Sequence, residues 1–117
     1  MIEIFGIGID LVNIEKFRKK PFKKNQSFYE RIFSKSEISY CLEFKNSYER
    51  FAGKFAIKEA VIKSIQDKIG FSQIEISYIN SKPIVKIKKI KKKYKFIISI
   101  SHENNFAVAV VISENIK

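Results

Sequence analysis

The sequence predicts an α+β fold, and three observations support this prediction. Apolar and β-branched residues fill positions 2–12, a pattern typical of a strand, and Gly6 and Gly8 within it indicate a close approach of another backbone. Helical patterns dominate residues 14–66. Short apolar stretches separated by turn signals follow, which favours an antiparallel β meander. Because helices and strands are segregated along the chain, an alternating α/β fold is not expected.

Length and composition favour one globular domain covering residues 1–117. Single domains commonly run to roughly 100–200 residues, and a chain of this size buries about two thirds of its unfolded surface. The hydrophobic fraction is 45% and the aromatic fraction 14%, which excludes a disordered chain. No internal repeat or Ser/Gly/Pro-rich linker divides the sequence.

The charge balance points to anionic partners. Lys and Arg number 23 and Asp and Glu 12, which gives a formal net charge of +11. A chain rich in Lys, Ile and Asn also fits AT-rich coding DNA, so much of this charge can equally be incidental. The single cysteine excludes an internal disulfide, and with one histidine there is no Cys/His metal cage.

The same composition favours a reducing, cytoplasmic location. The first ten residues lack the basic region and the cleavage site of a signal peptide. No apolar run approaches the roughly 20 residues of a membrane span. A soluble protein without a membrane partner is therefore expected.

Short helical elements are expected before the main helix. Residues 14–20 form a turn that ends before a proline, residues 23–26 a loop and residues 27–33 a short helix. Ser34 opens a further helix, and Glu37, three residues later, completes a capping box.

The strongest helix is predicted at residues 46–66, and apolar or small residues line most of its circumference. Such a helix should be central and largely buried. Glu59 and Lys63 lie one turn apart at the edge of the small-residue stripe, where they either form an ion pair or meet a ligand. The bulky side comprises Phe51, Phe55, Val61, Ile62 and Ile65, and the small stripe Ala52, Gly53, Ala56 and Ala60.

Four strands are expected in the last third of the chain. They lie at residues 74–78, 84–87, 96–101 and 106–112. A turn at 80–83, a basic turn at 88–93 and a hairpin loop at 102–105 connect them.

Two carboxylates fall where carboxylates are costly: Asp10 near the end of the first strand and Glu59 on the buried helix. This pair suits Mg²⁺, which usually takes one or two carboxylates and completes its shell with water and substrate phosphates. Lys63 would then face a phosphate as a point charge. The alternative is structural: Asp10 caps the following turn and Glu59 pairs with Lys63.

Two further features have a functional and a structural interpretation. His102 falls in an expected polar loop, where functional groups are common, but no Ser/His/Asp order indicates a hydrolase triad. The segment Lys86–Lys95 is either a nucleic-acid-binding surface or a solvated hairpin tip. Its single aromatic residue, Tyr94, does not resemble a stacking platform, which makes nucleic acid the less favoured partner.

Three motifs together resemble holo-(acyl-carrier-protein) synthases, the small trimeric bacterial type of phosphopantetheinyl transferase. Residues 6–12 resemble the opening of these proteins, and residues 51–63 resemble their central helix. Residues 99–102, followed by 106–110, resemble their C-terminal hairpin. The resemblance covers nearly the whole chain, with Glu30-Arg31-Ile32-Phe33, Glu37, Ile74-Glu75-Ile76 and Lys82-Pro83-Ile84-Val85 in the right order between the motifs.

The resemblance implies transfer of the phosphopantetheine arm of coenzyme A to a serine of an apo acyl carrier protein, with release of adenosine 3',5'-bisphosphate. Asp10 and Glu59 would hold Mg²⁺ on the pyrophosphate. Lys63 would stabilise the leaving group. Either Glu59 or a metal-bound water would deprotonate the carrier serine.

Binding roles follow from the same resemblance. Lys54, Lys63, Ser101 and His102 would contact coenzyme A. Lys16 and Arg18 would face the acidic carrier protein, and the basic surface would speed the encounter with both substrates. The resemblance also implies a homotrimer with active sites at subunit interfaces.

The chain departs from the resembled pattern at three places. Lys54 stands where an arginine is usual, so a bidentate grip on phosphate is lost. Residues 64–70 replace a Gly-rich turn, and Ser81 replaces a glycine. A catalytically degenerate member of the fold and a basic nucleic-acid-binding module are therefore the alternatives to an active transferase.

Overall fold

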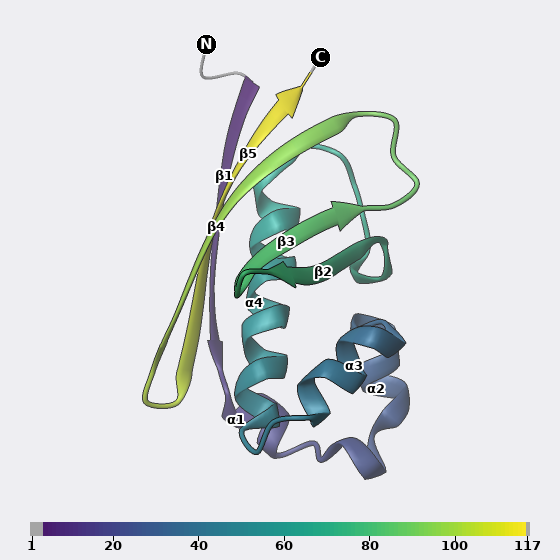
Figure 1. Cartoon of the computed structure of the whole chain (residues 1–117), viewed down its shortest axis with the longest axis vertical. Helices are drawn as coiled ribbons and strands as arrows, with labels where there is room; N and C mark the ends of the chain where they lie inside the picture. The colour runs from purple at the N-terminus through teal and green to yellow at the C-terminus, as the bar shows by residue number, and fades with distance from the viewer. Residues whose placement is uncertain (1–3, 117) are drawn as a thin grey trace.

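The computed structural model describes residues 4–116 (Figure 1). The elements follow in the order β1 (Phe5–Asn13), α1 (Glu15–Arg18), η2 (Phe22–Lys24), α2 (Gln26–Ile32), α3 (Lys35–Leu42), α4 (Ser47–Ser64), η3 (Phe71–Gln73), β2 (Ile74–Ile79), β3 (Lys82–Ile87), β4 (Lys93–Glu103) and β5 (Phe106–Ile116). The predicted α+β class is confirmed. The start of the predicted first strand, at residues 2 and 3, lies outside the described residues.

The strands form two antiparallel sheets. The larger sheet has the order β1-β5-β4, and β2 pairs only with β3. The last four strands therefore form two hairpins in separate sheets and not one continuous meander. The first strand completes the larger sheet: Asp10 pairs in register with Ala109 of β5, which pairs in turn with Ile100 of β4.

Helix α4 is the central element, as the sequence predicted. It runs along one face of the larger sheet, and the β2–β3 hairpin and helices α2 and α3 lie on its other side (Figure 1). Every residue from Phe51 to Lys58 is buried. Most of the circumference of this helix is covered, because the sheet and the small helices bury opposite sides of it.

Strand β1 and α4 touch backbone to backbone. A Cβ atom on Gly6 would overlap the carbonyl oxygen of Ser64, and one on Gly8 would overlap that of Ala60. The close approach predicted from the two glycines is confirmed. It brings Asp10, two residues after Gly8 on the same side of the strand, against the helix.

Three predictions of loops and turns were wrong. The turn predicted at 80–83 is shorter, because Lys82 and Pro83 begin β3 and pair with β2. Residues 23–26 are not a loop, because a 3₁₀ turn over Phe22–Lys24 leads almost directly into α2. The loop predicted at 102–105 is shorter, because His102 and Glu103 continue β4 and pair with β5. Only Asn104 and Asn105 remain for the turn, and the positive φ of Asn104, 53°, is one that asparagine tolerates.

The face of the larger sheet that points away from α4 is apolar and exposed. Among residues 4–116, no helix or hairpin covers this face in Figure 1. We call it the outer sheet face; its exposed large side chains are Phe5, Ile7, Ile9, Leu11, Ile97, Phe106, Ile112 and Ile116. Within residues 4–116, no helix is both long enough and apolar enough to cross a bilayer.

Candidate active site

A pocket of about 320 Å³ lies between β1 and α4, and both predicted carboxylates line it. Asp10 faces the helix because it shares the inward side of β1 with Gly8 and Val12, which are buried. Glu59 is only partly buried, although the helix around it is almost fully covered. The structure therefore brings together two carboxylates separated by 49 positions in the sequence.

Lys63 extends this site by pairing with Asp10. Its Nζ donates to the carbonyl oxygen of Ile9 at 3.0 Å and lies 3.3 Å from Oδ1 of Asp10. The Lys63 side chain is 52% exposed and the Asp10 side chain 15%. The pocket thus has a cation at its edge that is held by few contacts.

The structural alternatives for these residues were wrong. Within residues 4–116, Lys63 makes no ion pair with Glu59, because Asp10 on β1 lies within its reach. Among the hydrogen bonds of the described residues, Asp10 does not cap the following turn either. That role belongs to Asn13, whose Oδ1 accepts from the backbone N–H of Glu15 at 3.0 Å.

The two residues predicted to face a carrier protein occupy different places. Lys16 lines the pocket, and its Nζ lies 4.2 Å from the centroid of the Phe55 ring. Arg18 lies outside the pocket, where it bonds Glu15 at 2.6 Å and Asn105 at 3.1 Å. One of the pair is therefore part of the carboxylate pocket, and the other is on the surface beyond it.

Lys54 lies outside the pocket that Asp10 and Glu59 line. Its side chain is buried, with Nζ 4.7 Å from the ring centroid of Tyr40 and 4.5 Å from that of Tyr78. Burial lowers the pKa of Lys54. It lines a separate pocket of about 390 Å³, to which Glu75 also belongs.

Ser101 and His102 also lie outside the carboxylate pocket of their own chain. Successive residues of a strand point to opposite faces, so the two side chains diverge. His102 faces α4, where its Nε2 would lie 3.3 Å from a Cβ atom on Gly53. Ser101 points to the outer sheet face. Glu59 is six residues beyond Gly53, about 9 Å along the helix.

The donor set of the pocket suits a hard divalent cation. Searching residues 4–116 finds no cluster of three or more His, Cys, Asp and Glu side chains able to hold a metal ion. Two carboxylate oxygens are nevertheless enough for Mg²⁺, which leaves its remaining positions to water and substrate phosphate. Asp10 and Glu59 are thus the residues that fit such an ion.

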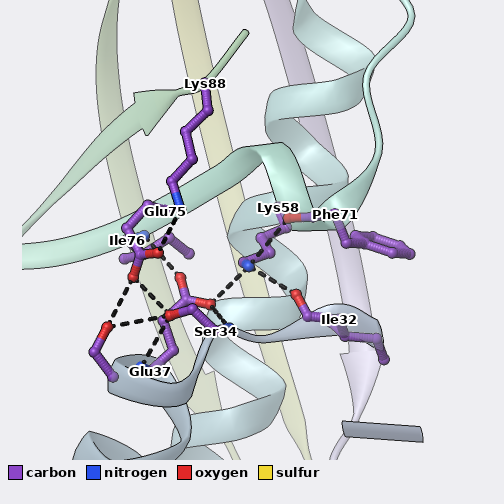
Figure 2. Close-up of polar contacts among 9 residues, drawn as sticks. Ile32, Ser34, Glu37, Lys58, Phe71, Glu75, Ile76 and Lys88 are labelled. Carbon is purple, nitrogen blue, oxygen red and sulfur yellow. Dashed lines mark hydrogen bonds and ion pairs between the residues drawn. The ribbon is translucent and has the colours of Figure 1, made fainter. Parts of the chain in front are cut away.

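A buried ion pair between Lys58 and Glu37 was missed by the sequence reasoning. Nζ of Lys58 donates to Oε1 of Glu37 at 2.7 Å and to the carbonyl oxygens of Ile32 at 2.7 Å and Phe71 at 3.3 Å (Figure 2). Oε2 of Glu37 accepts from the backbone N–H of Ile76 at 2.7 Å. The predicted capping box of Glu37 is confirmed as well.

This pair ties α4 to four other segments: the end of α2, the start of α3, η3 and β2. Its side chains are at most 1% exposed. The sequence did contain a signal for this pair: Lys58 falls on the buried side of an apolar helix, and a buried charge requires a partner. The pair fixes the helix that carries Glu59 but contacts no part of the pocket.

Comparison with known proteins gives a consistent result. Residues 6–111 match the family model of the 4'-phosphopantetheinyl transferase superfamily. The holo-(acyl-carrier-protein) synthase of Thermodesulfovibrio yellowstonii is 40% identical over 115 residues, which cover 96% of this chain and 98% of that relative. The protein of the same name from Mycoplasma capricolum is 34% identical over 113 residues, covering 95% and 96%.

A solved structure shows the same fold. The crystal structure of Helicobacter pylori holo-(acyl-carrier-protein) synthase in complex with coenzyme A matches with a TM-score of 0.78 and 35% sequence identity. The match covers 92% of this chain and 99% of that one.

Proposed function

The chain belongs to the 4'-phosphopantetheinyl transferase superfamily, and we propose that it transfers phosphopantetheine from coenzyme A to a serine of an apo acyl carrier protein in a Mg²⁺-dependent reaction. The second product is adenosine 3',5'-bisphosphate. One observation carries the proposal: Asp10 and Glu59, from distant parts of the chain, line one pocket, and Lys63 is paired with Asp10 at its edge.

Asp10 and Glu59 are the residues that would hold the metal. When bound, Mg²⁺ neutralises negative charge on the two phosphates as the phosphorus–oxygen bond breaks. Lys63 supplies a further positive charge for the leaving adenosine bisphosphate. The Lys63 side chain is 52% exposed, so its ammonium is free to leave Asp10 for a phosphate oxygen.

The carrier serine must lose a proton as its oxygen attacks the phosphorus. Glu59 lines the pocket and, within residues 4–116, forms no ion pair with Lys or Arg. The carboxylate oxygen of Glu59 that does not hold the metal can therefore accept this proton. Lys16, which also lines the pocket, would attract an acidic carrier toward it, and Arg18 would extend the basic surface beyond the pocket.

We further propose that the functional form is a homotrimer with active sites at subunit interfaces. The outer sheet face is a contiguous apolar surface of the kind that marks protein interfaces. The three predicted coenzyme contacts Lys54, Ser101 and His102 lie outside the Asp10 pocket of their own chain. Ser101, which points to the outer sheet face, would lie in such an interface.

The nucleic-acid alternative gains no support from the basic segment at residues 86–95. Its only aromatic residue, Tyr94, donates its hydroxyl hydrogen to Asp67 and stacks on Phe96 at 5.9 Å. Lys88 and Lys92 already pair with Glu75 and Asp67. The segment therefore offers positive charge without a free stacking surface.

Intact-mass spectrometry tests the proposed function. An apo acyl carrier protein is mixed with the folded protein, coenzyme A and Mg²⁺, and a matched sample contains EDTA. We expect the carrier to gain the mass of one phosphopantetheine arm only when the metal is available. A gain that persists in EDTA would overturn the metal dependence. Failure to modify any of several apo carriers would overturn the transferase assignment.

A further inference from the structure

We propose that Lys63 is a built-in counter-ion of Asp10 that competes with the metal for this carboxylate and, once released, couples metal binding to coenzyme binding. The inference rests on the proposed function, because it takes Asp10 as a metal ligand. The observation behind it is the position of the ammonium, 3.3 Å from Oδ1 of Asp10. The carboxylate of Asp10, which would bind the metal, is thus already paired with a cation from the same chain, the ammonium of Lys63.

The contacts of Lys63 make it easy to release. It has two acceptors, Asp10 and the carbonyl oxygen of Ile9, and half of its side chain is exposed to water. Ion pairs of this kind change an equilibrium by a factor of about five at most. Lys58 on the same helix is the opposite case, since its three acceptors and complete burial hold it in place.

Competition for one carboxylate creates coupling between two ligands. When a divalent cation takes Asp10, the ammonium of Lys63 loses its partner beside the place where the pyrophosphate of coenzyme A is expected. A phosphate oxygen then becomes its natural partner. Binding of metal therefore favours binding of coenzyme, and by reciprocity the coenzyme favours binding of metal to the same extent.

Lys16 provides a matched control. It lines the pocket that holds Asp10 and Glu59 and carries the same charge as Lys63, but its ammonium lies over the Phe55 ring and not on Asp10. Replacing either lysine by methionine removes one positive charge from the surroundings of the two carboxylates. Only Lys63→Met also removes the group that occupies the carboxylate, so the difference between the two variants isolates the competition.

The test measures binding of Mn²⁺, a paramagnetic ion that accepts the same oxygen ligands as Mg²⁺. Free Mn²⁺ is followed by electron paramagnetic resonance in titrations of the wild type, Lys63→Met and Lys16→Met. We expect Lys63→Met to bind Mn²⁺ alone about fivefold more tightly than the wild type and Lys16→Met to stay within about twofold. With saturating coenzyme A, corrected by a protein-free titration, the advantage of Lys63→Met should fall below about twofold.

Two results would overturn the inference. The first is equal tightening in both variants, because the effect would then be the loss of charge alone. The second is an advantage of Lys63→Met that persists with coenzyme A, because Lys63 would then not move between the two partners. If the wild type modifies the carrier and either of these results is found for the variants, only this inference is overturned. A wild type that neither binds Mn²⁺ nor modifies the carrier overturns the proposed function as well.

Discussion

Lys58 and Lys63 lie five residues apart on α4, and each pairs with a carboxylate from another element, but the two pairs differ in burial and in the number of contacts. Lys58 meets Glu37 at 2.7 Å with both side chains at most 1% exposed. Lys63 meets Asp10 at 3.3 Å with its own side chain 52% exposed. Burial and three acceptors fix the first cation, whereas exposure to water and only two acceptors leave the second free to exchange partners.

The difference shows how one helix serves stability and chemistry on separate sides. The side that carries Lys58 faces α2, α3 and η3, where a polar network closes on itself (Figure 2). The side that carries Glu59 and Lys63 faces β1 and a pocket open to solvent. Adjacent residues, Lys58 and Glu59, therefore have different tasks because the helix points them to different sides.

The largest expected effect comes from breaking the buried pair. Lys58→Met leaves Glu37 as a buried charge without a cation, and the free energy of unfolding should fall by about 3–5 kcal/mol. Urea denaturation followed by circular dichroism measures this change. The double variant Lys58→Met/Glu37→Gln removes both charges and keeps an acceptor for Ile76, so it should recover at least half of the loss. A single variant as stable as the wild type would contradict the structural role of the pair.

Cys41, one turn after Glu37 on α3, gives a second test of the buried pair, through the accessibility of its thiol. Burial raises the pKa of its thiol from 9.0 to about 12. The folded state therefore holds a proton that the unfolded state releases above pH 9, so the free energy of unfolding falls as pH rises from there toward 12. At pH 8 the wild-type thiol should resist disulfide reagents, and Lys58→Met should label faster.

The next largest effect is on activity and comes from the pocket side of the helix. Glu59→Gln removes a metal-binding carboxylate, and the rate of carrier modification should fall by at least about 100-fold with the unfolding free energy unchanged within about 0.5 kcal/mol. Glu49→Gln, in the first turn of the same helix, is the matched control and should retain the wild-type rate. A Glu59→Gln enzyme with the wild-type rate would show that Glu59 is not needed for the transfer.

A substitution between strand and helix sharpens the comparison because it tests how tightly the pocket is held. Gly8→Ala places a methyl group on the carbonyl oxygen of Ala60, which cannot rotate away, and should cost about 1–3 kcal/mol. Gly70→Ala is the control: no atom lies within 4 Å of the new Cβ and φ is −100°, so stability should stay level or rise slightly. Thermal unfolding of both variants measures the difference. Equal melting temperatures would contradict the close approach.

The smallest expected effect concerns the rim of the pocket. Lys16→Gln and Arg18→Gln should each raise the KM for the carrier by a few-fold, and the wild-type KM should rise with salt, because these contacts are electrostatic. Steady-state rates at two ionic strengths test both points. A KM for the carrier that depends on neither residue nor salt would place carrier binding elsewhere.

Much of the fold and the core of the site could be predicted from the sequence. Spacing along one helix placed Glu59 and Lys63 together, and the glycines of β1 indicated the contact that presents Asp10. The partner of Lys63 could not be predicted, because its carboxylate comes from a strand 53 positions away. The buried partner of Lys58 was missed for the same reason.

The strand positions of Ser101 and His102 show a different limit of prediction from sequence. Their side chains point in opposite directions because the side chains of a strand alternate between its two faces. Prediction from the sequence missed this, because it placed His102 in a loop at 102–105. Which coenzyme contacts they make, the role of Lys54 and the single domain over residues 1–117 stay predictions. Contacts between copies of the chain leave no pattern in a sequence beyond the apolar side of β1.

The most direct test of the account is the initial rate of carrier modification by Lys63→Met, measured by intact-mass spectrometry against the wild type at equal concentrations of folded protein. The exposed pair contributes less than about 1 kcal/mol to stability, so the variant should fold normally. We predict a rate at least tenfold lower, because the leaving phosphate loses its cation. An unchanged rate would contradict the account, since Lys63 would then have no part in the transfer.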